Sequence, residues 1–259
     1  ALTLSLFMTL MIGMPLVGLL ISGRQQSDRN ARIWFLAIVL DSLQIPLIAL
    51  RDGMPSWWTI VLPGVIPVMF YMTLCTVIRR ELGLTMVRPW LRVMQVGCLY
   101  LFAISVVNAI LADSLFVIGA INNLIFVLFS VLISFRSYKL ARKTSSRGMW
   151  LVALGFLVSI VGYGIRAWFH LVLGVATPVF GFSLVSNFQV WTISINLILI
   201  TFGYLGYVLE KAEAAKIAMA AEAAEAIARE KTAEEYSARR WLFSIQRLCT
   251  RSASLCRLR

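Results

Sequence analysis

The chain has 259 residues, of which 60% are hydrophobic and only 14% are charged, and its formal net charge is +12. A soluble domain normally carries about a quarter charged residues. Here the apolar residues form long runs, and the first of them, Leu2–Ser22, contains no charge and is long enough to cross a bilayer as a helix. No charged segment precedes it, which argues against a cleaved secretory signal. Composition therefore excludes an ordinary soluble domain and indicates an integral membrane protein.

The placement of the basic residues argues against nucleic acid as a partner. Of the 24 Lys and Arg residues, 14 precede Glu210, and nearly all of these lie in short loops between apolar runs. Membrane insertion produces such a distribution, whereas a phosphate-binding face gathers its charges on one surface.

Seven apolar stretches predict an all-α integral membrane fold, a seven-transmembrane helix bundle. Each has the length of about 18 to 25 residues that a spanning helix needs. Pro63, Gly64 and Pro67 predict a kink in the third helix. In chain order the stretches are Leu2–Ser22, Ile33–Leu50, Thr59–Ile78, Val93–Leu111, Leu115–Phe135, Met149–Leu173 and Phe188–Val208.

Loop charges predict the orientation of the bundle. The loops after helices 1, 3 and 5 hold twelve Lys and Arg residues, and the loops on the other side hold Arg51 alone. By the positive-inside rule, the N-terminus is outside and the C-terminus is cytoplasmic. An aromatic belt at the predicted helix ends agrees with these spans: Trp34, Trp57, Trp58, Trp90, Trp150, Trp168 and Trp191.

The sequence changes character after Val208, so we divide the chain into a seven-helix transmembrane domain (1–208), a cytoplasmic helix (209–245) and a basic tail (246–259). The middle segment lacks Gly and Pro, is rich in strong helix formers, and is expected to continue helix 7 out of the membrane. Glu225 with Arg229 and Glu235 with Arg239 form i,i+4 pairs in the favourable order. A mostly alanine stripe with Ile217 and Ile227 leaves two alternatives open, a solvated single helix and a homodimeric coiled coil.

Few residues could support catalysis or hold a cofactor. The chain has one histidine, so a His-rich metal site is excluded, and the segment after Val208 has no glycine for a phosphate-binding loop. The seventh helix has no lysine for a retinal Schiff base. None of the four cysteines has metal-ligand spacing with the histidine or an extracytoplasmic partner for a disulfide. We therefore expect no catalytic residues, metal or cofactor.

Polar residues inside the predicted helices are the candidates for a ligand site. Asp41 lies within helix 2, where an unpaired charge costs about 3 kcal/mol or more. Gln44 is one turn away, and Arg166 and His170 are an i,i+4 pair in the outer half of helix 6. With the outer-end residues Asn108, Asn122, Asn123, Asn187 and Gln189, they are predicted to surround a polar pocket that opens outward. The alternative is that these groups only join helices through hydrogen bonds or reach the headgroups.

The segment Asn30–Gly83 resembles the seven-helix N-terminal input region of bacterial histidine kinases and GGDEF-type diguanylate cyclases. The resemblance rests on a tryptophan-led helix, an Arg-x-Gly-x-x-Pro-x-Trp turn and an Arg-Arg-x-x-Gly exit. It extends more loosely through Arg166 and the TFGY run Thr201–Tyr204, to about residue 240. The matching residues are Arg51, Gly53, Pro55, Trp57, Arg79, Arg80 and Gly83.

One departure from that resemblance is the missing output domain. The tail has no His-Glu-x-x-x-Pro box, no nucleotide-binding glycines and no Gly-Gly-Asp-Glu-Phe motif. Codons can be chosen for Gln246–Arg257 such that a shifted frame encodes a His-Glu-x-Arg-x-Pro-Leu box, which leads to the hypothesis that the chain is truncated by a frameshift near Ile245. The alternative is a genuine basic tail that rests on anionic lipid.

The resemblance implies a signal-transduction receptor in the bacterial inner membrane, the input module of a two-component system without an enzymatic core. Membrane lipid, a small-molecule or membrane stimulus, and a second copy bound through the C-terminal helix are its expected partners. One alternative is a small transporter, but the sequence has no obvious inverted repeat and only one intramembrane acid, Asp41. The other alternative is an intramembrane enzyme, but the sequence offers no catalytic pair.

Overall fold

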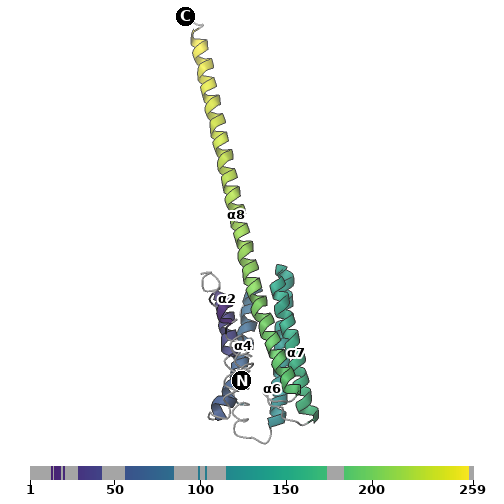
Figure 1. Cartoon of the computed structure of the whole chain (residues 1–259). Helices are drawn as coiled ribbons and strands as arrows, with labels where there is room; N and C mark the ends of the chain where they lie inside the picture. The colour runs from purple at the N-terminus through teal and green to yellow at the C-terminus, as the bar shows by residue number, and fades with distance from the viewer. Residues whose placement is uncertain are drawn as a thin grey trace. The chain divides into compact units, whose positions relative to one another are not determined.

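The computed structural model describes residues 29–42, 56–84, 115–173 and 184–256, with residues 13, 15–18, 20, 99 and 103 in addition. All regular secondary structure in these residues is helical. The helices, labelled in Figure 1, are α2 (Arg29–Ser42), α4 (Ser56–Glu81), α6 (Leu115–Thr144), α7 (Arg147–Leu173) and α8 (Leu184–Cys256). The predicted helices Leu2–Ser22 and Val93–Leu111 lie almost entirely outside the described residues.

Three described segments are long and apolar enough to cross a membrane, which makes the chain a multi-pass membrane protein by length and composition. They are Gly119–Thr144, Arg147–Val172 and Trp191–Ile245. The all-helical membrane class is thus confirmed, while the number of seven spans stays a prediction. Helix α4 runs unbroken through Pro63, Gly64 and Pro67. The prolines do not end it, and the expected kink stays a prediction.

Helices α6 and α8 extend furthest beyond their predicted C-terminal ends. Helix α6 continues nine residues past Phe135 to Thr144, and Arg142 and Lys143 in its last turn complement the helix dipole. Helix α8 continues to Cys256, eleven residues past Ile245. The added segment contains no Gly or Pro that would stop a helix.

Helix α4 ends in a complete Schellman motif. Gly83 has φ 75°, a left-handed conformation that glycine adopts without a steric penalty. Its N–H donates to Arg80 O (2.9 Å), and the N–H of Leu84 donates to Arg79 O (3.0 Å). The Arg-Arg-x-x-Gly pattern therefore has a physical reason, since the glycine ends the helix and both arginines lie in its last turn.

Helices α6 and α7 are joined by two residues, Ser145 and Ser146. Ser145 takes the left-handed conformation with φ 54°, and the N–H of Ser146 donates to Ala141 O (3.1 Å), which closes α6. The Oγ of Ser146 then accepts from the N–H of Met149 (3.1 Å), as an N-cap does. So short a connection makes α6 and α7 antiparallel neighbours.

Glycines at every seventh position of α7 bring it close to α8. A Cβ at Gly148 would overlap the carbonyl oxygen of Gly203, a Cβ at Gly155 would lie 3.0 Å from Ile200, and a Cβ at Gly162 would overlap Thr192. Along the contact, the residue numbers of α8 fall as those of α7 rise, so the two helices are antiparallel. Small residues at such spacing let helices pack closely in a membrane. We call this contact the glycine seam.

The chain divides into two compact units, Ala1–Val208 and Leu209–Arg259. In the second unit, every described side chain from Glu213 to Ile245 is exposed. The predicted pair of Glu225 and Arg229 is present at 3.3 Å. Exposed pairs of this kind contribute about 0.3–0.5 kcal/mol. The coiled coil stays a prediction.

Candidate functional site

A polar cluster connects four helices of the first unit. Ser130 Oγ on α6 donates to the hydroxyl of Tyr71 on α4 (3.3 Å), and Tyr71 in turn donates to the hydroxyl of Tyr163 on α7. The Asp41 carboxyl on α2 is close enough to both tyrosines to act on them electrostatically. We call Asp41, Tyr71, Ser130 and Tyr163 the tyrosine cluster.

Aromatic rings surround the tyrosine cluster. Phe126 packs between the two tyrosines, with ring centroids 5.7 Å from Tyr71 and 5.2 Å from Tyr163. Phe156 lies 5.9 Å from Tyr71. Polar groups in apolar surroundings interact more strongly than in water, so the geometry of the cluster is sensitive to a change in any member.

Arg166 and His170 continue the polar surface along α7. Arg166 is one turn from Tyr163 and acts electrostatically on both Tyr163 and His170. The imidazole of His170 lies against Gly119 of α6, where a Cβ would come within 3.3 Å of the ring. His170 is 4% exposed, and its Nδ1 has no hydrogen-bond partner among the described residues.

Two asparagines on α6 lie beside this histidine contact and differ in their bonding. Asn123 Nδ2 donates to Gly119 O (2.6 Å). The buried Oδ1 of Asn122 has no partner in the part of the chain that the structure describes. Buried polar atoms are normally satisfied, so this oxygen, three residues along α6 from Gly119, is a position where a polar ligand or a water would gain a hydrogen bond.

Of the predicted site residues, His170 and Asn123 meet at Gly119, and Arg166 lies one turn before His170 on α7. Asp41 on α2 and Arg166 both act electrostatically on Tyr163. Gln44 and Asn108 lie outside the described residues. Asn187 and Gln189 are helical residues of α8, but their side chains are not among those that the structure describes. An outward-opening pocket stays a prediction.

A second set of contacts joins α2, α4 and α8 at the other end of the same unit. Asn30 Nδ2 donates to Glu81 Oε1, and the hydroxyl of Tyr207 donates to Glu81 Oε2, both at 2.7 Å. Both carboxylate oxygens are thus bonded, one to α2 and one to α8. Beside them, Lys143 Nζ donates to Leu82 O (3.2 Å) and ties α6 to the end of α4. We call Asn30, Glu81 and Tyr207 the glutamate clasp.

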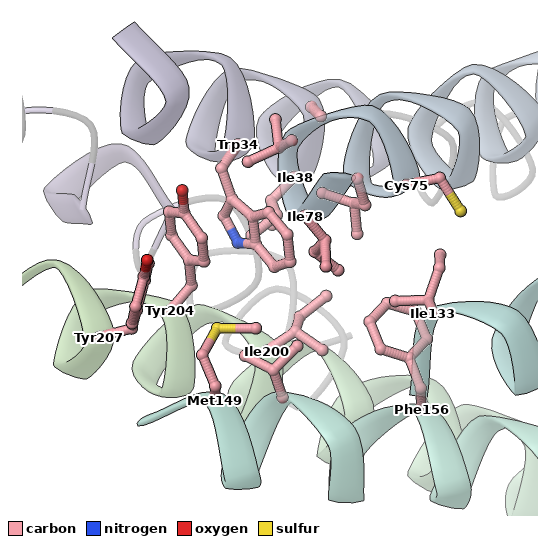
Figure 2. Packing of buried hydrophobic residues seen from close by; sticks show 14 of the residues in the cluster. Trp34, Ile38, Cys75, Ile78, Ile133, Met149, Phe156, Ile200, Tyr204 and Tyr207 are labelled. Carbon is pink, nitrogen blue, oxygen red and sulfur yellow. The ribbon is translucent and has the colours of Figure 1, made fainter. Parts of the chain in front are cut away.

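Stacked rings lie next to the glutamate clasp. Figure 2 shows the indole of Trp34 beside the ring of Tyr204. The two rings are stacked, with 4.0 Å between centroids and 8° between planes. Phe35 meets Tyr204 edge-on at 6.0 Å, and Tyr204 is 5.7 Å from Tyr207. Trp34 and Tyr204 have no solvent exposure. Helix α8 is thus fixed to α2 by ring packing and to α4 by a charged hydrogen bond.

Sequence reasoning missed the clasp and both tyrosines of the cluster. Tyr71 and Tyr163 lie inside apolar runs, where a tyrosine is ordinarily a packing residue, and Glu81 is 126 residues from its partner Tyr207. One signal was available in the sequence. Trp34 of α2 and the TFGY run Thr201–Tyr204 of α8 both belong to the pattern on which the resemblance rests. In the structure these motif residues meet at one end of the unit.

No group of three or more His, Cys, Asp or Glu that could hold a metal occurs in the described residues. Comparison of the chain with protein-family models, with curated proteins and with solved structures finds no match.

Proposed function

We propose that the chain is a membrane signal-transduction receptor, the input module of a sensor resembling bacterial histidine kinases. Seven spanning helices place the N-terminus outside and the C-terminus in the cytoplasm of a bacterium. A stimulus that reaches the tyrosine cluster and the neighbouring Arg166 and His170 alters the packing of α2 and α4. The glutamate clasp passes this change to α8.

One observation carries the proposal: α2 and α4 each contribute to both the tyrosine cluster and the glutamate clasp. Helix α2 bears Asp41 and Asn30, about 16 Å apart at 1.5 Å per residue, and α4 bears Tyr71 and Glu81, about 15 Å apart. A helix moves as a rigid rod over such a length. A shift of either helix at the cluster therefore displaces the carboxylate or the amide that positions α8.

The orientation in this proposal has support from the contacts of the described helices. Asn30, Glu81, Lys143, Gly148 and Tyr207 all lie at one end of the first unit, and so do the described basic residues of the predicted cytoplasmic loops. In a cysteine-free variant, a cysteine at Ser145 should resist a membrane-impermeant thiol reagent applied from outside, while one at Asp113 should react. The reverse labelling pattern would overturn the orientation.

A fusion tests the signalling role. The dimerisation and ATP-binding core of a sensor histidine kinase is joined in frame after Arg240, and autophosphorylation is measured in membranes. Glu81→Gln and Tyr207→Phe should change the phosphorylation level by about fivefold or more, the usual size of an allosteric coupling. Leu128→Ala, at a side chain 69% exposed on α6, is the matched control and should change nothing. Equal phosphorylation in all active fusions would contradict the proposal and return the transporter to consideration.

A further inference from the structure

Two contacts define how α6 and α7 face each other at the end farthest from their two-residue connection. The rings of Phe126 and Tyr163 lie 5.2 Å apart, and seven residues along each helix the imidazole of His170 lies against Gly119. Asn122 lies between Gly119 and Phe126 on α6, about one turn from each, and therefore on the same face of the helix. It thus belongs to the face of α6 that packs on α7.

The imidazole of His170 turns its polar edge toward α6. Measured from the position that a Cβ on Gly119 would take, the ring atoms Cε1, Nε2 and Nδ1 lie at 3.3, 3.5 and 3.6 Å. These three atoms form the edge that carries both ring nitrogens. A methyl group at position 119 would press the ring aside, so the glycine keeps open the space in front of the two nitrogens.

A buried hydrogen-bonding atom without a partner among the described residues lies on each side of this space. On α7 it is Nδ1 of His170, whose side chain is 4% exposed, and on α6 it is Oδ1 of Asn122. The neighbouring amide of Asn123 is already bonded, since its Nδ2 donates to Gly119 O (2.6 Å). Side chains one turn apart on a helix begin about 5–6 Å from each other. One oxygen atom between the helices can therefore reach both atoms at hydrogen-bond lengths of about 2.8 Å.

We infer that this space binds the hydroxyl group of a neutral, largely apolar molecule that enters from the bilayer. A hydroxyl accepts from an N–H at Nδ1 of His170 and donates to Oδ1 of Asn122, whereas an ether or a ketone only accepts and leaves the amide oxygen without a donor. A charged group is disfavoured because both residues lie in segments that are apolar enough to span the membrane. The described side chains next to His170 on the surface of α7 are apolar and exposed: Trp168, Leu171 and Val172.

The inference names the ligand class for the site of the proposed function, and it rests on that function only for the consequence of binding. The binding itself is measured without an output domain. A chain that fails to signal in the kinase fusion can still bind the alcohol, and a chain that signals can fail to bind it, so the two failures are distinguishable.

The test uses the full chain in nanodiscs and one NMR signal. His170 is the only histidine in the chain, so labelling histidine with ¹⁵N reports on this site alone. The Nδ1 shift is followed while 1-decanol or decyl methyl ether is added at equal mole fractions in the lipid. The ether is the matched probe, because it has the same decyl chain and lacks only the O–H. The alcohol should shift the signal and bind about tenfold more tightly than the ether, the difference expected for one buried hydrogen bond.

Two substitutions test the two sides of the space. Asn122→Leu should abolish the preference for the alcohol over the ether, because only the bond to Oδ1 distinguishes the two probes. Gly119→Ala should weaken the binding of both probes by about tenfold or more, since its methyl group occupies the space. Gly164→Ala is the matched control, with nothing within 4 Å of its Cβ, and should bind both probes as the unmodified chain does.

Three outcomes would overturn the inference. Equal affinities for the alcohol and the ether in the unmodified chain, or no shift with either probe, would mean that the space holds at most a water. A preference for the alcohol that survives in Asn122→Leu would mean that the hydroxyl binds elsewhere. Should Gly119→Ala fail to fold, the comparison of the two probes in the unmodified chain and in Asn122→Leu decides.

Discussion

The tyrosine cluster and the glutamate clasp are both polar contacts inside one apolar bundle, yet they are built differently. At the clasp, each oxygen of Glu81 accepts one bond of 2.7 Å, and the glycine seam beside it has no room for a methyl group. Next to the cluster, His170 Nδ1 and Asn122 Oδ1 have no partner among the described residues. The indole N–H of Trp34 beside the clasp also lacks a partner among those residues, so the two regions differ in the bonded carboxylate and the close-packed seam, which fix the geometry of the clasp end.

The largest expected effect is at the glycine seam beside the clasp. Gly148→Ala places a methyl group on the backbone of Gly203 and Tyr207, which cannot move aside as a side chain can, so α7 and α8 must separate. We expect a loss of about 3 kcal/mol in unfolding free energy, measured by reversible denaturation in bicelles. Gly164→Ala is the control, because nothing lies within 4 Å of its Cβ, and it should stabilise the helix by about 0.5–1 kcal/mol. Similar losses in both variants would mean that the seam is not close-packed.

A smaller effect is expected at the carboxylate of the clasp. Glu81→Gln replaces a charged acceptor and leaves one of its two donors with a poor partner, which should cost about 1.5–3 kcal/mol in the same assay. Tyr207→Phe removes only one hydrogen bond and should cost about half as much. If Tyr207→Phe cost more than Glu81→Gln, the hydroxyl of Tyr207 would have a role other than its bond to Glu81.

The cluster should tolerate substitution better than the clasp. Ser130→Ala removes the 3.3 Å bond to Tyr71 and should cost about 0.6 kcal/mol, the average for a hydrogen bond between spanning helices. Asn122→Leu removes a buried oxygen that has no partner in the described part of the chain, so its effect should be near zero or stabilising. A loss of several kcal/mol in Asn122→Leu would show that this amide is already satisfied, and the contrast between the two regions would fail.

Local patterns allowed part of this structure to be predicted from the sequence. Long apolar runs predicted α4, α6, α7 and α8, and the absence of Gly and Pro after Gly206 predicted that helix 7 and the segment after it form one helix, α8. The exit glycine Gly83 was recognised from its motif, and its left-handed φ supplies the reason. The i,i+4 pair of Arg166 and His170 was also visible, since helical spacing alone decides which residues share a face.

Contacts between distant segments could not be predicted in the same way. Which glutamate meets which tyrosine depends on how whole helices pack, and no local pattern encodes the pairing of Glu81 with Tyr207. The seven-residue spacing of Gly148, Gly155 and Gly162 was present in the sequence and would have indicated a close helix contact, although not its partner. Helix α8 continues beyond its expected end at Ile245 because the segment that follows has no Gly or Pro. Ser and Arg residues alone do not end a helix.

A double-mutant cycle between the two regions tests the central claim most directly. Unfolding free energies are measured in bicelles for Asp41→Asn, Glu81→Gln and the double variant, with Leu128→Ala replacing Glu81→Gln in a control cycle. Side chains about 15 Å apart ordinarily contribute additively, within about 0.3–0.5 kcal/mol. If α2 and α4 couple the tyrosine cluster to the glutamate clasp, the first cycle should depart from additivity by about 1–2 kcal/mol while the control stays additive. Additivity in both cycles would contradict the account.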